Sequence, residues 1–113
     1  MVAPLDLVCR AVGDPTRRAI LDRLRQGELT AGGLAEAFPI SRPAVSRHLR
    51  VLREARLLKA RQEGRQRIYR LDPKPLATMD AWLTSYRVFW AARLQDLKSF
   101  AENQHRGRKR PDH

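Results

Sequence analysis

The sequence predicts a mainly α-helical fold that carries one small β-hairpin. Apolar residues recur at helical spacing before residue 58 and again from residue 76 to residue 97. Between these stretches, residues 59–62 and 66–71 are strand-like. They flank Glu63-Gly64-Arg65, where the glycine can supply the positive φ of a hairpin turn. The predicted order is therefore four helices, a hairpin and one long helix.

The composition indicates a folded protein with a polyanionic partner. The chain has 113 residues, 42% of them hydrophobic, which suits one small domain. Lys and Arg number 23 against 12 Asp and Glu, so the formal net charge is +11. Such an excess is typical of proteins that bind nucleic acid or an anionic membrane surface. Because no run approaches the roughly 18 apolar residues of a membrane span, we expect double-stranded DNA as the partner and no membrane.

Cys9 is the single cysteine, which excludes an internal disulfide and fits a reducing compartment. We expect Cys9 to be a small buried apolar residue. The sequence shows no pattern of a secretory signal, so we expect a cytoplasmic protein.

Three short helices are predicted before residue 40. The first ends at Gly13, the second begins at the N-cap Asp14 with Pro15 in its first turn, and the third begins at the N-cap Thr30. Their apolar faces consist of Leu5, Val8, Cys9 and Val12, then Ile20, Leu21 and Leu24, then Leu34, Ala35 and Phe38.

A fourth helix begins at the N-cap Ser41 after a tight turn at Pro39-Ile40. Val45, Leu49 and Leu52 lie at i, i+4 and i+7 and predict its buried stripe. The opposite face carries Pro43, Ser46, Arg47 and Arg50. From this helix through the hairpin, residues 42–70 contain ten basic and only two acidic residues, so this segment is the predicted polyanion-binding surface.

The last helix follows Pro73 and Pro75 and has an apolar seam close to a heptad repeat, which is typical of a dimer interface. The seam consists of Leu76, Met79, Leu83, Tyr86, Trp90, Leu94 and Leu97. Aromatic residues along it could also line a ligand pocket. Residues 105–113 are basic and lack apolar residues, so we expect a flexible tail there and a folded domain over residues 1–104.

Helices followed by a two-stranded hairpin in this order predict a winged helix-turn-helix domain. In that arrangement the fourth helix can enter the major groove of DNA, where every base pair presents a distinct donor and acceptor pattern. The hairpin tip, with Arg65, can then reach the flanking minor groove.

Four ordered motifs resemble the ArsR/SmtB family of bacterial repressors. They are residues 13–21 (GDPTRRAIL), residues 28–30 (ELT) with 34–35 (LA), residues 41–49 (SRPAVSRHL) with 51–55 (VLREA), and residues 63–65 (EGR) with 69–71 (YRL). The resemblance covers about residues 5 to 100.

The resemblance implies a homodimer, formed by the first and last helices, that binds an inverted-repeat operator in the bacterial nucleoid and represses its own or a neighbouring operon. The expected DNA contacts are Ser41, Arg42, Pro43, Ser46, Arg47, His48, Arg50, Arg53, Arg65 and Arg67. The expected interface residues are Leu5, Val8, Leu76, Met79, Leu83, Tyr86, Trp90, Leu94 and Leu97.

The chain departs from the family pattern in two places. Metal sensors of the family place cysteines in the third helix, or His and Asp on the last; here residues 28–38 contain no Cys or His, and the last helix has no His before His105. We therefore expect no metal site and no cofactor. The family usually has glycine where this chain has Arg56, so either the fourth helix ends differently or Arg56 gains a contact, such as a phosphate.

Several alternatives stay open at this point. His48 lies one residue from the buried stripe and is either a packed, hydrogen-bonded side chain or a phosphate contact. A sensor with a small ligand near the last helix, and a protein-interaction module without specific DNA binding, are the rival functions. The sequence contains neither a nucleophile–base constellation nor a Gly-rich phosphate loop, so no enzymatic activity is predicted.

Overall fold

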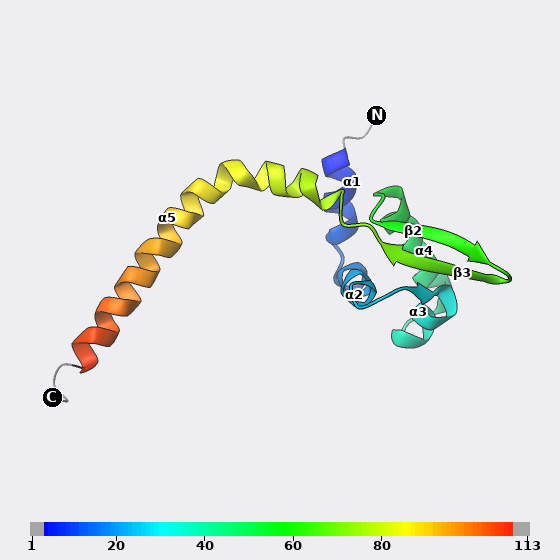
Figure 1. The fold of residues 1–113 in the computed structure, drawn as a ribbon, viewed down its shortest axis with the longest axis horizontal. Coiled ribbons are helices and arrows are strands. Elements are labelled where there is room, and N and C mark those ends of the chain that lie inside the picture. The colour runs from blue at the N-terminus through cyan, green and yellow to red at the C-terminus, as the bar shows by residue number, and fades with distance from the viewer. Residues whose placement is uncertain (1–3, 110–113) are drawn as a thin grey trace. The chain divides into compact units, whose positions relative to one another are not determined.

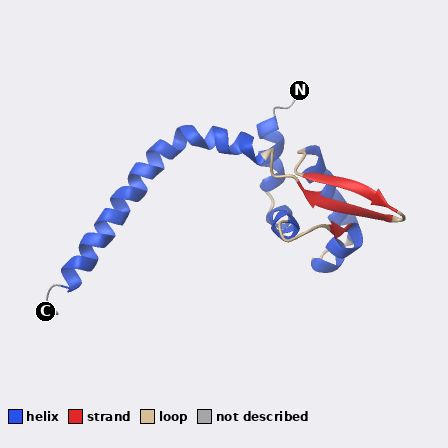
Figure 2. Ribbon diagram, in the orientation of Figure 1, coloured by secondary structure: helices blue, strands red, loops and turns tan. Residues whose placement is uncertain are grey.

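The computed structural model describes residues 4–109 of the chain, with side chains described through residue 104. The described residues divide into two compact units, with the division between Met79 and Asp80. The elements in chain order are α1 (Pro4–Val12), α2 (Pro15–Leu24), β1 (Leu29–Thr30), α3 (Ala31–Ala37), α4 (Arg42–Glu54), β2 (Leu58–Glu63), β3 (Gln66–Leu71) and α5 (Leu76–Lys109) (Figure 1). The predicted class is confirmed: the fold is mainly α-helical and carries one β-hairpin, the wing, formed by β2 and β3 (Figure 2).

All three predicted N-caps hold the first turns of their helices. In each, the side-chain oxygen accepts a hydrogen bond from the backbone N–H three residues later. The pairs are Asp14 with Arg17 at 3.0 Å, Thr30 with Gly33 at 2.9 Å and Ser41 with Ala44 at 3.2 Å. Local sequence therefore fixes where α2, α3 and α4 begin.

The end of α4 keeps the left-handed turn despite the missing glycine. Arg56 has φ 62°. Its N–H donates to the Arg53 carbonyl at 2.9 Å, and the Leu57 N–H donates to the Leu52 carbonyl at 3.0 Å. These two bonds are a Schellman motif, and Leu52 and Leu57 supply its apolar contact because both are fully buried. The helix therefore ends as it would with glycine, at a conformational cost of about 1 kcal/mol.

The sheet has three strands where two were predicted. Its order is β1-β3-β2, and all pairs are antiparallel. Leu29 of β1 pairs with Tyr69 of β3, which in turn pairs with Ala60 of β2. Tyr69 is buried and Ile68 is half-buried, so Tyr69 faces the core and Ile68 lies on the other face of the sheet. The wing is thus anchored to the segment that leads into α3.

The core of residues 4–79 gathers the predicted apolar faces of α2, α3 and α4. Its buried members are Val8, Ala11, Ile20, Leu21, Leu24, Leu34, Val45, Leu49, Leu52, Ala55, Leu57, Leu58 and Tyr69. Two expectations for α1 need correction. Val8, expected at a dimer interface, is buried in this core, and Cys9, expected to be buried, is exposed. The α1 face that packs inward follows Val8 and Ala11, which turns Cys9 outward.

Residues 80–104 of α5 form one continuous helix with many apolar side chains in solvent. Trp82, Tyr86, Val88, Phe89, Trp90, Leu94, Leu97 and Phe100 are all exposed. The helix extends to Lys109, into the segment predicted to be a flexible tail, and residues 110–113 of that segment lie outside the described residues. Among the helices described, none is long and apolar enough to span a membrane.

Candidate nucleic-acid interface

Helix α4 presents one apolar and one basic face. Val45, Leu49 and Leu52 are 2%, 3% and 0% exposed, as the predicted stripe requires. The residues on the other side are exposed, namely Arg42, Pro43, Ser46, Arg47, Arg50 and Arg53. Packing on one side therefore fixes which side chains α4 offers to a partner.

A groove of about 390 Å³ runs between α3, α4 and the wing. Arg42, Ser46, Arg50 and Arg53 line it from α4, and Arg67 lines it from β3. The guanidinium carbon of Arg67 lies 5.8 Å from the centroid of the Tyr69 ring, a cation–π contact that holds this side chain at the groove. Five of the predicted DNA-binding residues therefore converge on one hollow. Sequence reasoning did not place α3 at the same groove, where Ala31, Gly32 and Ala35 complete the wall.

Arg47 and His48 lie on the other flank of α4, beside Arg17 of α2. The Nη1 atom of Arg17 lies 3.3 Å from Nδ1 of His48. The same Nδ1 atom lies 3.9 Å from Oδ2 of Asp14, so the His48 ring is next to both side chains. The side chain of His48 is half-buried in these contacts, and its contact with DNA stays a prediction.

Arg17 is a positioning residue that the sequence did not single out. Its Nε donates to the Ala11 carbonyl at 2.7 Å and its Nη2 to the Arg10 carbonyl at 2.9 Å. These are carbonyls at the end of α1, which have no partner within the helix. Arg17 therefore ties the end of α1 to α4 through His48. Its place in the GDPTRR motif was visible in the sequence, but its partners were not.

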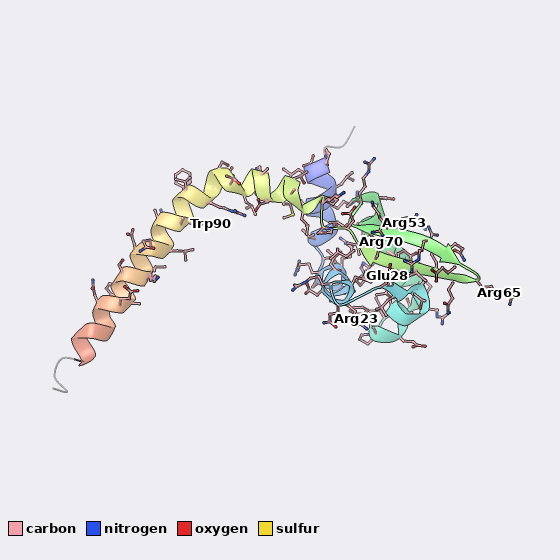
Figure 3. All side chains as sticks on the ribbon, viewed as in Figure 1. Arg23, Glu28, Arg53, Arg65, Arg70 and Trp90 are labelled. Atoms are coloured by element: carbon pink, nitrogen blue, oxygen red, sulfur yellow. The ribbon has the colours of Figure 1, made fainter. Side chains whose placement is uncertain are left out.

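Two of the predicted DNA contacts, Ser41 and Arg65, lie at the ends of secondary-structure elements: Ser41 caps α4 and Arg65 lies at the hairpin turn. The Ser41 hydroxyl already accepts the cap bond from Ala44. Arg65 lies at the wing tip, next to Gly64 with φ 59°, and Figure 3 shows it at the far end of the hairpin.

Two other basic side chains of residues 42–70 are already paired. Arg61 forms a bidentate ion pair with Glu28, one bond of which joins Nη2 to Oε1 at 3.1 Å, and its Nε reaches Glu63 at 3.1 Å. The hydrogen bond from Arg61 holds the pKa of Glu28 below its usual value, and Glu28, with Glu63, raises the pKa of Arg61. Lys59 lies 3.4 Å from Asp72.

The other eight cations of this segment have no ion pair with any side chain described, residues 4–104. They are Arg42, Arg47, Arg50, Arg53, Arg56, Arg65, Arg67 and Arg70. A polyanion can therefore bind them without first breaking an internal ion pair.

The residues predicted to form the dimer interface differ in exposure. Leu76 and Met79 pack against the core of residues 4–79, and Leu5 and Leu83 are half-buried. Tyr86, Trp90, Leu94 and Leu97 are 50%, 45%, 61% and 64% exposed. Within the residues described, no three His, Cys, Asp or Glu side chains gather in a group that could hold a metal ion.

A basic helix that follows another helix through a short turn, with a β-hairpin beside it, defines a winged helix-turn-helix DNA-binding domain. In this chain α3 and α4 are the two helices, and β2 and β3 form the hairpin.

Residues 14–60 match the family model described as bacterial regulatory protein, arsR family. The chain is 47% identical over 99 residues to the HTH-type transcriptional regulator Rv2034 of Mycobacterium tuberculosis, covering 88% of this chain and 90% of that protein. It is 39% identical to the transcriptional repressor SdpR of Bacillus subtilis, covering 70% and 88%.

Solved structures agree with these sequence matches. An ArsR-like transcriptional regulator from Rhodococcus sp. RHA1 superposes with a TM-score of 0.71 at 32% identity, covering 88% of this chain and 92% of that one. The chain belongs to the ArsR family of DNA-binding transcriptional regulators. It is a regulator and not an enzyme, as the sequence predicted.

Proposed function

We propose that this protein is a homodimeric repressor of its own or a neighbouring operon. The observation that carries the proposal is the groove between α3, α4 and the wing, where Arg42, Arg50, Arg53 and Arg67 converge without counter-ions among the described side chains. The relatives named repressors support the direction of regulation.

The proposed mechanism follows from the shape of this surface. The exposed face of α4 enters the major groove, where a bidentate arginine can distinguish guanine. The remaining arginines hold phosphates and set the register. Arg65 follows the neighbouring minor groove, whose negative potential attracts a guanidinium. The bound protein then occupies the DNA that RNA polymerase needs.

A dimer is supported by the apolar side chains of α5. Tyr86, Trp90, Leu94 and Leu97 recur along one side of the helix and are about half or more exposed in the single chain. Contiguous exposed apolar surface is typical of an interface in a protein of this size. In a two-fold dimer, two copies of α4 would read an inverted repeat with half-sites about one helical turn apart.

Regulation without the family's usual metal sites is part of the proposal. The region corresponding to α3 contains no Cys or His, so it lacks the soft ligands that such sensors use. We expect the affinity for operator DNA to stay the same, within about twofold, when Zn²⁺ or arsenite is added and when a chelator is present. A tenfold metal-dependent change in the dissociation constant contradicts this part of the proposal.

Operator binding can be tested by fluorescence anisotropy with labelled DNA from upstream of the coding sequence. We expect specific binding at physiological salt, protection of an inverted repeat in a footprint, and loss of roughly tenfold or more in affinity for Arg50→Gln. Glu36→Gln is the matched control, because Glu36 is exposed on α3 and does not line the groove. Equal affinity for operator and scrambled DNA contradicts specific repression.

A further inference from the structure

A second hollow, of about 910 Å³, lies beside the end of α4 and the edge strand β2. Its lining is strongly cationic, and five of its basic residues have no ion pair with any side chain the structure describes: Arg50, Arg53, Arg56, Arg70 and Lys74. Figure 3 shows Arg53 and Arg70 at the same end of the wing. Like charges gathered this way repel one another, and a bound anion would relieve the repulsion.

The acidic residues at this hollow leave most of that charge uncompensated. Asp72 accepts from the Lys74 backbone N–H at 3.1 Å and pairs with Lys59 at 3.4 Å, so its carboxylate is already engaged. The Lys74 N–H is the main cause that holds the pKa of Asp72 below its usual value. Glu54 is the other carboxylate in the lining.

Arg56 gives a second and independent reason to regard this hollow as a site. It occupies a left-handed backbone conformation, with φ 62°, where glycine is free of strain. Its side chain lines the hollow. Strain of this kind is often found where the side chain has a function.

The hollow shares two residues with the DNA-binding groove. Arg50 and Arg53 line both. The guanidinium of an arginine that binds a ligand in the second hollow is therefore less free to contact DNA in the first.

We propose that the second hollow binds a small organic anion, with a phosphate group on an apolar body, and that this anion competes with DNA for Arg50 and Arg53. Guanidinium groups bind phosphate bidentately, which accounts for the cationic rim. Leu58, Ile68 and Pro75 supply apolar lining, and the volume lies in the range of small-molecule sites. The competition rests on the proposed DNA binding, whereas anion binding does not.

The anion site can be tested directly on the full chain without DNA. Isothermal titration calorimetry with phenyl phosphate as the probe should show saturable binding, weaker binding of inorganic phosphate, and none of phenol. Arg56→Gln should weaken phenyl phosphate binding at least tenfold, since one charge-assisted contact is lost while the backbone conformation is retained. Arg42→Gln, on the other groove, should bind the probe as the wild type does.

The competition is tested by anisotropy with operator DNA at constant ionic strength. Phenyl phosphate should raise the apparent dissociation constant of the wild type for DNA in proportion to its concentration. In Arg56→Gln the same probe concentration should raise that constant less, relative to the variant's own constant without the probe. Absence of probe binding at millimolar concentration overturns the proposal. So does an Arg56→Gln variant that binds the probe normally but loses DNA affinity, because Arg56 would then be a contact to the DNA backbone.

Discussion

Helix α4 and residues 80–104 of α5 carry apolar stripes of similar helical periodicity in opposite environments. Leu52 of α4 is fully buried, whereas Leu94 of α5 is 61% exposed. The apolar stripe of α4 is buried in the core of residues 4–79, and this packing turns the basic face of α4 outward. The stripe of α5 has no equivalent burial in the single chain. Periodicity alone thus predicts that a face will be buried, but not whether its partner is the same chain or another copy.

The largest effect is expected where α4 packs. Leu52→Ala should lower the free energy of unfolding by about 2–5 kcal/mol, because it removes buried methyl groups and leaves a cavity. Urea denaturation at one fixed protein concentration measures this, since dimerisation would add a concentration-dependent contribution. Leu52→Met is the matched control and should lose less than about 1.5 kcal/mol. A loss below about 1 kcal/mol for the alanine variant would show that this stripe is not the core we describe.

A smaller effect of a different kind is expected on α5. Trp90→Ala should weaken dimerisation by about 2 kcal/mol, or roughly 30-fold in the dissociation constant, because large aromatic residues dominate most interfaces. Sedimentation equilibrium gives that constant. Val88→Ala is the control, because Val88 is 72% exposed and lies about 200° around the helix from Trp90. A wild-type protein that stays monomeric at micromolar concentration contradicts the dimer.

Features set by neighbouring residues were predictable from the sequence. Asp14, Thr30 and Ser41 were identified as caps because a cap is defined by its own side chain and the N–H three residues later. The inward stripe of α4 and the turn at Gly64 follow equally local rules. These features locate most of the proposed DNA-binding surface.

Features that depend on distant partners were missed. β1 is only two residues long. Leu29 belongs to a strand because it pairs with Tyr69, and no local sequence pattern predicts that pairing. Arg61 looked like a free cation until the fold brought Glu28 beside it. Likewise, the contact of Arg17 with His48 joins residues 31 positions apart. The sequence predicted the charge of the surface, but the fold decides which cations are free.

The end of α4 gives a third, smaller test. Arg56→Gly should raise the free energy of unfolding by about 1 kcal/mol, because glycine adopts the left-handed conformation without the Cβ penalty. Arg56→Ala removes the guanidinium but keeps Cβ, and it should show no such gain. Chemical denaturation of both variants separates the backbone effect from the charge. An equal gain for both would mean that relief of charge repulsion, and not backbone strain, is responsible.

The smallest effect concerns the cap of α2, which positions Arg17 beside α4. The N–H of Arg17 is the main cause that holds the pKa of Asp14 below its ordinary value of 3.8. Because the folded-state pKa is lowered, the stabilisation is complete above that ordinary value and is lost as the pH falls through the folded-state pKa. Asp14→Asn keeps a capping oxygen but does not titrate. We therefore expect the wild-type Tm to fall relative to that of Asp14→Asn between pH 5 and about pH 2, as measured by calorimetry. Parallel Tm curves for the two proteins over this range would show that the Asp14 carboxylate contributes no pH-dependent stability.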